Sequence, residues 1–370
     1  MTTFTPETIY IHLWKKANKE DEQMKEELKR RFLNALEKYH SLGIAEQIDY
    51  QKFYLYSLIT HSTAIEGSTV TEIENQLLFD EGITAKGRSL QEQMMNLDLK
   101  AAYEHSMQLA NQHTDFSTEI LKELSAKVMK NTGASYNTAQ GSFDASKGDL
   151  RLVGVTAGIG GRSYMNYQKV PAKLIALCQQ LNERRRLLLQ STDIIAQYLL
   201  SFDAHYQLVT IHPWVDGNGR MSRLVMNQLQ YEFGLVPVKI VKEDKAEYIQ
   251  ALIDSREQES LEHFHEFMME EHIRNICKEI EEFKKSQTDD PINVISDPIK
   301  ASSDPIKQKL YQAIVQDNTL NYADYAAQIG ASEATVKRRL GELKNDGIII
   351  RVGSNKTGHW EIVKQISSFS

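Results

Sequence analysis

The chain has 370 residues, of which 41% are hydrophobic and 25% charged, and its formal net charge at pH 7 is -7. That length allows two or three domains with a substantial core, the composition is ordinary for a globular protein, and the charge gives no general nucleic-acid or membrane-surface signature. Cys178 and Cys277 lie in segments with helical patterns, so we expect no disulfide framework and a cytoplasmic protein. No apolar run approaches the roughly 20 residues that span a bilayer, so we expect no membrane partner.

Seven prolines and long apolar periodicities predict a mainly α-helical protein. Residues 8–42 and 48–59 have helical patterns, and the stretch 62–67 (Ser-Thr-Ala-Ile-Glu-Gly) follows them. On its own, the Glu-Gly pair indicates the end of a helix, and Thr71 indicates the start of the next one. Helices continue over residues 72–110.

The central part of the chain contains further predicted helices and one segment of different amino-acid composition. A helix over residues 117–130 begins with its own serine cap. Residues 148–170 are rich in Val, Tyr and Gly, which predicts two short β segments around a turn at 158–161. The glycines there do not form a dinucleotide fingerprint, because neither a preceding βαβ context nor a following phosphate-binding helix is evident. Helical patterns then follow over residues 172–189, 192–207 and 244–282.

A glycine-rich loop lies between two of these helices. Gly217 and Gly219 allow backbone conformations that turn successive N–H groups to one side, which suits an anion. From Arg220 onward the apolar residues have a helical period, and Gly234 marks the stop. The loop therefore opens a helix, and the N-terminus of a helix attracts phosphate.

Charged side chains flank this loop. Arg220 and Arg223 are three residues apart on one helix face and can grip phosphate oxygens. Asp216 can hold a magnesium ion through oxygen, and His212 offers a base that titrates near neutral pH. We interpret this run as a phosphate-handling site.

Residues 212–223 resemble the Fic motif, H-x-F-x-(D/E)-G-N-G-R-x-x-R, of enzymes that usually transfer AMP from ATP to a hydroxyl side chain of a protein. Trp214 stands where the family mostly has Phe and keeps an aromatic anchor. The resemblance implies ATP as substrate, Mg²⁺ on Asp216 and His212 as catalytic base. It also implies phosphate contacts from Gly217, Asn218, Gly219, Arg220 and Arg223.

Two other segments take a role through this resemblance. The pattern S-x-x-x-E-G at Ser62, Glu66 and Gly67 resembles the inhibitory motif of Fic proteins, which implies that Glu66 pairs with Arg223 and excludes the γ-phosphate of ATP. A guanidinium binds a carboxylate or a phosphate in the same bidentate manner. Residues 148–170 would be the flap, a β-hairpin whose edge pairs with the target protein.

The last part of the chain resembles a winged helix-turn-helix domain. Its helices are expected at 305–315, 322–329 and 333–345, and its two strands at 348–351 and 360–363. Lys337, Arg338 and Arg339 would face outward from the third helix and contact DNA. Residues 301–370 carry nine Lys and Arg against seven Asp and Glu, a net charge of +2, which is weak for phosphate-driven affinity. A protein-interaction or dimerisation module is the alternative.

The expected organisation is an N-terminal helical region with the inhibitory motif (1–110), a Fic helical core with a β-hairpin flap (111–282), a linker (283–304) and the winged domain (305–370). The expected partner is a protein substrate. Whether the chain also modifies itself, and whether it forms a homodimer, are left open. Removal of AMP, transfer of another phosphate-containing group, and a nucleotide-sensing DNA-binding regulator are the alternative functions. A zinc protease is rejected, because H-E-x-x-H would need histidine where Met269 stands.

Overall fold

A computed structural model describes most of the chain, and contacts divide it into two units, one ending at Ile280 and one beginning at Glu281. The described residues are 25–47, 49–157, 161–288, 305–318, 320–345, 349–352 and 359–362. The predicted helix over 8–42 is confirmed for residues 25–41, and its first part lies outside the described residues. The four-part division proposed from the sequence stays a prediction.

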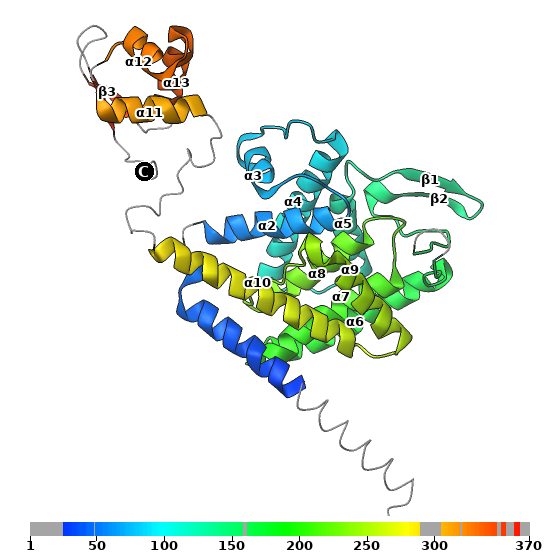
Figure 1. Ribbon diagram of the computed structural model, residues 1–370. Coiled ribbons are helices and arrows are strands. Elements are labelled where there is room, and N and C mark those ends of the chain that lie inside the picture. The colour runs from blue at the N-terminus through cyan, green and yellow to red at the C-terminus, as the bar shows by residue number, and fades with distance from the viewer. Residues whose placement is uncertain are drawn as a thin grey trace, which may run out of the picture. The chain divides into compact units, whose positions relative to one another are not determined.

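The first unit is built from helices, as predicted, with one small hairpin (Figure 1). After the helix at 25–41, its elements are η1 (Ile44–Glu46), α2 (Tyr50–Ile65), α3 (Glu72–Glu81), α4 (Leu90–Asn111), α5 (Thr118–Val128), β1 (Ser135–Thr138), β2 (Gly141–Asp144), η2 (Ala145–Lys147), η3 (Tyr167–Lys169), α6 (Val170–Leu188), α7 (Ile194–Ile211), α8 (Asn218–Glu232), η4 (Lys242–Asp244), α9 (Lys245–Glu257) and α10 (Glu262–Thr288).

Side-chain caps fix where several of these helices begin. Thr71 forms a capping box with Glu74 at the start of α3, and Ser89 forms one with Glu92 at the start of α4. Ser117 accepts a hydrogen bond from the backbone N–H of Ile120 and caps α5 without a box. These caps satisfy N–H groups that have no partner within the helix.

Helix α8 lies at the centre of the first unit. Twelve of its 15 residues are buried, and it contacts α2, α4, α5 and α7. Figure 1 shows it in the middle of the helical body, with α10 running along one side. A helix surrounded in this way loses the usual solvent-exposed face, so its polar residues are buried together with its apolar ones. This burial accounts for the buried arginines described below.

The β structure differs from the prediction. The antiparallel hairpin is β1–β2, in which Tyr136 pairs with Phe143, and Figure 1 shows it projecting from the body. The two rings stack with centroids 5.0 Å apart, a cross-strand contact that supports the hairpin. The segment 148–170 was predicted to contain two short β segments around a turn at 158–161. Its described residues pair across that position through one isolated antiparallel bridge, Thr156 to Ser163, with backbone hydrogen bonds from Ala157 to Arg162 and from Tyr164 to Val155, and do not extend into longer strands.

The described part of the second unit contains three helices and a pair of strands, besides the last residues of α10. These are α11 (Pro305–Gln316), α12 (Tyr322–Ile329), α13 (Glu333–Asn345), β3 (Ile349–Val352) and β4 (His359–Ile362), with Ile349 opposite Ile362. Val336, Leu340 and Leu343 of α13 are buried in the core of this unit. Helix α10 continues to Thr288, six residues into the segment predicted as the linker; residues 289–304 lie outside the described part.

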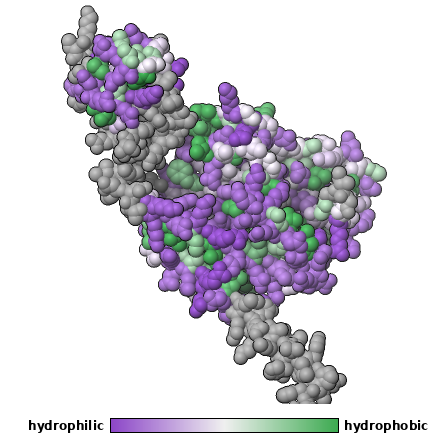
Figure 2. Space-filling model, in the orientation of Figure 1, coloured by the Kyte–Doolittle hydropathy of each residue, from purple (hydrophilic) through white to green (hydrophobic). Residues whose placement is uncertain are grey.

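The visible surface of the first unit is mainly hydrophilic along α10 (Figure 2). This helix exposes acidic and basic side chains, among them Glu262, Arg274 and Lys278, and its Glu270 forms an ion pair with Arg31 at 2.6 Å. Among the described residues, no helix is long and apolar enough to cross a membrane.

Candidate active site

His212 is the residue that ends α7. Its φ of 52° lies in the left-handed region, and it caps the helix by donating its N–H to Leu208 O. The ring Nδ1 lies 3.3 Å from Val209 O. A carbonyl only accepts, so Nδ1 carries the proton and Nε2 keeps its lone pair. The imidazole is therefore oriented as a base.

Burial keeps His212 neutral. The half-buried imidazole has a pKa lowered to about 4, because burial disfavours the charged ring and the Arg151 guanidinium adds to the effect. The Val209 carbonyl, Asp216 and Glu66 act in the opposite direction and are outweighed. A neutral imidazole can accept a proton at neutral pH.

The loop after His212 brings the start of α8 into the site. Gly217 has φ 81°, and a Cβ there would lie 2.7 Å from Met129 Sδ, so this position requires glycine. Within α8, Met221 N donates to Gly217 O at 2.9 Å, which leaves the preceding N–H groups of the first turn to face a ligand. The carboxamide of Asn218 contacts both the N–H and the carbonyl of Trp214. This favours shaping the loop over the predicted phosphate contact.

Trp214 anchors the loop, as expected of an aromatic residue at that position. Its side chain is buried and donates from Nε1 to Gly148 O at 3.1 Å. The predicted flap segment and the loop are thereby joined at one end.

Arg220 faces the loop from the first turn of α8. It is 3% exposed, and its guanidinium lies 3.8 Å from the carboxylate of Asp216. Burial lowers the pKa of Arg220, although Asp216 and Glu66 partly offset this effect. Among the described residues, its Nε has no hydrogen-bond partner. A buried arginine with an unpaired donor suits an anionic ligand.

Arg223 is held by two residues of the predicted inhibitory motif, Ser62 and Glu66. Its Nε donates to Ser62 Oγ at 2.8 Å, and one terminal nitrogen donates to Ser62 O at 3.0 Å and to Glu66 Oε1 at 2.6 Å. Gly67 follows with φ 103° and ends the turn after α2. A Cβ at Gly219 would lie 2.5 Å from Glu66 Oε1. The Glu66 carboxylate therefore lies directly against the glycine loop.

Glu66 is ionised in this position. Burial raises the pKa of its carboxyl. The charge and hydrogen bond of Arg223 lower this pKa and contribute to a net downward shift. For Arg223, burial lowers the pKa and Glu66 raises it, with a net upward shift. An anion thus occupies the first turn of α8, where helix N–H groups and two guanidiniums meet.

Asp216 is the acidic side chain of the loop. It is 64% exposed, and its Oδ1 accepts the N–H of Gly217 at 2.6 Å. In the described ranges no group of three or more His, Cys, Asp or Glu is placed to hold a metal. Magnesium in nucleotide sites is commonly held by one or two carboxylates together with phosphate oxygens and water. Asp216 fits that pattern as a single protein ligand.

Two residues that the sequence did not single out complete the site. Arg151 is 1% exposed and donates to the carbonyls of His212, Val153 and Met165 at 2.7, 2.7 and 2.5 Å. The ring of Tyr164 stacks on His212 with centroids 3.7 Å apart. Both come from the predicted flap segment. A lone Arg or Tyr in a polar segment carries no signal of such contacts.

The predicted DNA-contact residues differ in exposure. Lys337 and Arg338 are exposed on α13, whereas Arg339 is half-buried and donates to Glu342 at 2.7 Å. Arg339 is therefore less accessible than Lys337 and Arg338, and the DNA contacts of all three residues stay a prediction.

Comparison with known sequences identifies two domains. Residues 115–230 match the sequence model of the Fic/DOC family, and residues 303–350 match that of a winged helix-turn-helix DNA-binding domain. Protein adenylyltransferase fic-1 of Caenorhabditis elegans is 26% identical over 204 residues, which cover 55% of this chain and 36% of that protein. Protein adenylyltransferase Fic of Drosophila melanogaster is 30% identical over 237 residues, covering 62% and 42% respectively. The matches thus span about two fifths of these relatives.

Solved structures share the fold. Fic-1 (residues 134–508) of C. elegans aligns with a TM-score of 0.57 at 20% identity, over 72% of this chain and 76% of that one. A Fic domain containing signaling protein of Bacteroides thetaiotaomicron aligns with a TM-score of 0.56 at 20% identity, over 69% and 98%. The chain therefore contains a Fic/DOC domain with the Fic helical fold, followed by a winged helix-turn-helix domain.

Proposed function

We propose that this chain is a protein adenylyltransferase that moves AMP from ATP to a Ser, Thr or Tyr hydroxyl of a protein, including its own. The observation that carries the proposal is the first turn of α8, where Arg220 and Arg223 are buried beside a glycine loop and His212 precedes it. The matched relatives, which are named protein adenylyltransferases, support the same activity.

The side chains supply the groups that this transfer needs. The hydroxyl oxygen of the target attacks the α-phosphorus of ATP, its proton passes to Nε2 of His212, and the bond to the leaving pyrophosphate breaks. The first-turn N–H groups of α8 and the guanidinium of Arg220 stabilise the charge on the phosphates. Asp216 would hold Mg²⁺, which would neutralise phosphate charge when bound.

Glu66 supplies autoinhibition in this proposal. Its carboxylate contacts Arg223 at 2.6 Å and competes for the guanidinium that would hold the γ-phosphate. A phosphate oxygen and a carboxylate oxygen make the same charge-assisted hydrogen bond, so one excludes the other. ATP would then bind with its γ-phosphate displaced until Glu66 moves away.

The test is to incubate the purified protein with ATP labelled with phosphorus-32 at either the α or the γ position. We expect only label from the α position to be incorporated into protein. The Glu66→Gly variant should incorporate more of this label than wild type. His212→Ala should lose label by about 10²–10⁴-fold while it still binds ATP. Incorporation of label from the γ position would indicate phosphate transfer in place of AMP transfer. No incorporation by wild type or by Glu66→Gly would contradict the proposal.

For the second unit we propose DNA binding, because its match is to a DNA-binding domain and Lys337 and Arg338 are exposed on α13. Lys337→Glu with Arg338→Glu should weaken retention of the full chain on mixed-sequence duplex DNA and lower the salt slope by about two. The same charge reversal at Lys29 and Arg30, exposed in the first unit, should have little effect. Equal loss of DNA retention in the two double variants, or no retention of wild type even at low salt, would indicate a protein-interaction module instead.

A further inference from the structure

Three hydrogen bonds tie Arg223 to α2, two to Ser62 and one to Glu66. A Cβ at Gly219 would lie 3.1 and 3.5 Å from the two terminal nitrogens of Arg223, so the guanidinium points at the first turn of α8. When Glu66 gives way to a γ-phosphate, these contacts with α2 weaken, and a long side chain such as arginine then loses much of its order. A productive site therefore needs a support for Arg223 from an element other than α2.

Tyr248 supplies such a support from α9. Its side chain is 2% exposed. Burial raises the pKa of its hydroxyl to about 12, while the charge of Arg223 and a side-chain hydrogen bond with Arg223 act in the opposite direction. A guanidinium only donates, so the phenol oxygen is the acceptor in this contact. Tyr248 thus binds Arg223 without involving α2.

His205 of α7 fixes the hydroxyl of Tyr248. Its Nε2 lies 3.1 Å from the phenol oxygen. Burial, together with the charge of Arg223, lowers the pKa of His205 well below its ordinary value, so the ring is neutral. Because the phenol oxygen accepts from Arg223, its proton is free to be donated to Nε2. The ring of Phe264 stacks on His205 with centroids 5.1 Å apart. A chain of hydrogen bonds therefore runs from Arg223 through Tyr248 into the core.

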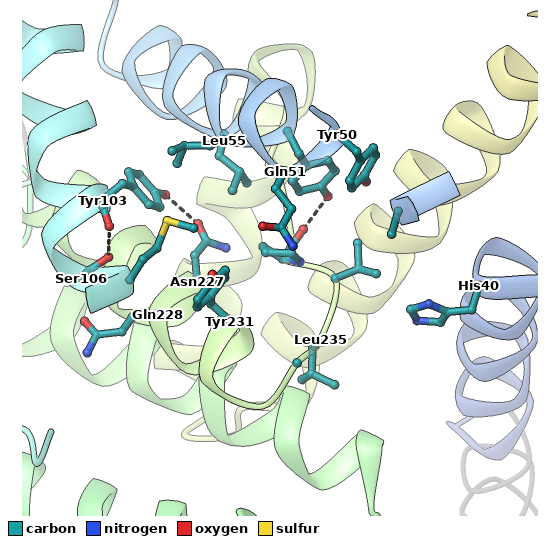
Figure 3. Close-up of a pocket in the computed structure, with 17 residues that line it drawn as sticks. His40, Tyr50, Gln51, Leu55, Tyr103, Ser106, Asn227, Gln228, Tyr231 and Leu235 are labelled. Carbon is teal, nitrogen blue, oxygen red and sulfur yellow. Dashed lines mark hydrogen bonds between the residues drawn. The ribbon is translucent and has the colours of Figure 1, made fainter. Parts of the chain in front are cut away.

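Tyr103 of α4 is a second buried tyrosine close to Arg223. Burial raises its pKa, and the charge of Arg223 opposes this effect. Figure 3 shows its hydroxyl directed at Asn227 of α8, beside a cavity that both residues line, and it donates to Asn227 Oδ1 at 2.7 Å. The proton of Tyr103 is thus committed to α8, which makes this residue a matched control for Tyr248.

We propose that Tyr248, held by His205, is the positioning residue that keeps the guanidinium of Arg223 directed at the γ-phosphate of ATP once α2 releases it. The inference rests on the proposed function, in which Arg223 holds either Glu66 or the γ-phosphate. Ser62 and Glu66 position Arg223 in the inhibited state, and Tyr248 and His205 position it in the active state. Loss of the Tyr248 hydroxyl should therefore matter only after release, and only for a nucleotide with a γ-phosphate.

Calorimetric titration with ATP and with ADP, each with Mg²⁺, tests the proposal. His212→Ala is present in every variant, so that binding is measured without transfer. The released background, Ser62→Ala/Glu66→Gly/His212→Ala, lacks two of the three contacts with α2, and we expect it to bind ATP more tightly than ADP. Adding Tyr248→Phe should weaken ATP binding by about three- to tenfold, as the loss of one hydrogen bond implies, and leave ADP binding unchanged. In His212→Ala alone, Tyr248→Phe should alter neither affinity.

Three further substitutions in the released background calibrate this effect. Arg223→Ala removes the guanidinium itself and should abolish the preference for ATP. Tyr103→Phe should keep the preference, because the Tyr103 hydroxyl serves Asn227. Tyr198→Phe should also keep it. The hydroxyl of Tyr198 lies 3.2 Å from His272 Nε2 in another buried tyrosine–histidine pair, so this variant controls for the loss of such a pair.

The proposal is overturned if Tyr248→Phe keeps the ATP preference of the released background, or if Tyr103→Phe or Tyr198→Phe loses it to the same extent. Circular dichroism checks that each variant is folded. If Tyr248→Phe is not, His205→Phe, which keeps a ring and removes the acceptor, should lower the preference instead, and an unchanged preference in that variant overturns the proposal. A released background that binds ATP and ADP equally overturns both this inference and the γ-phosphate role of Arg223. AMP transfer itself is measured separately, by incorporation of α-label.

Discussion

Replacement of Arg151 by Met tests whether a buried arginine holds the catalytic histidine. Its guanidinium donates to three main-chain carbonyls, those of His212, Val153 and Met165. At about 1 kcal/mol of net stability for each hydrogen bond, the substitution should cost about 3 kcal/mol. Hydrogen bonds from a charged donor are stronger, but burial already lowers the pKa of Arg151 and reflects an opposing desolvation cost.

Differential scanning calorimetry measures this loss as a shift of the thermal transition. At about 2–4 °C per kcal/mol for a domain of this size, the melting temperature of the first unit should fall by about 6–12 °C. The melting temperature of Arg151→Lys should lie between those of wild type and Arg151→Met. A lysine ammonium keeps the charge but lacks the planar set of donors with which the guanidinium contacts three carbonyls. Arg30→Met is the control: it removes an exposed arginine from an i,i+3 ion pair and should change the melting temperature by less than about 2 °C.

The same variant should slow the transfer reaction. Arg151 Nε contacts His212 O, so the imidazole loses its fixed position, and a displacement of about 1 Å can cost about 10²-fold in rate. The labelling rate is measured well below the melting temperature of each variant. A melting temperature and rate equal to those of Arg30→Met would refute the reasoning.

Further predictions concern the histidine and the metal. In protein with carbon-13-labelled histidine, the His212 signal should stay neutral down to about pH 5, because its pKa is lowered to about 4 and protonation begins only as pH falls toward that value; a midpoint near 6.5 would show that burial does not govern it. Tyr164→Ala removes the stacked ring that helps to bury His212 and should raise the pKa of His212 toward its ordinary value; an unchanged titration would show that Tyr164 does not contribute to this burial. Chelation of Mg²⁺ should stop labelling, and Asp216→Asn should raise the magnesium concentration needed for half the maximal rate; an unaltered requirement would remove Asp216 as ligand.

Local features of the site could be predicted from the sequence. The glycines and the helical period after Arg220 indicate a loop that opens a helix, and α8 begins at Asn218. The pairing of Glu66 with Arg223 is a contact between residues 157 positions apart. No local pattern indicates such a contact, and it could be expected only through the resemblance to Fic proteins.

Other features depend on tertiary contacts and could not be predicted. Val, Tyr and Gly in residues 148–170 favour strands, but the pairing there is limited to one bridge, Thr156 to Ser163, and Arg151 donates to the carbonyls of Val153 and Met165 on either side of it. The hairpin at β1–β2 has few β-branched residues, and the stacking of Tyr136 on Phe143 supports it.

The central claim is that Arg223 can hold either Glu66 or the γ-phosphate of ATP. The direct test is the initial rate of self-labelling from α-labelled ATP by wild type, Glu66→Gly and the double variant Glu66→Gly/Arg223→Ala. Glu81→Gly is the matched control, because Glu81 also precedes a glycine at the end of a helix, α3, and is exposed. We predict that Glu66→Gly is faster than wild type, that the double variant is slow again, and that Glu81→Gly is unchanged. A rate in Glu66→Gly equal to that of wild type would contradict the account.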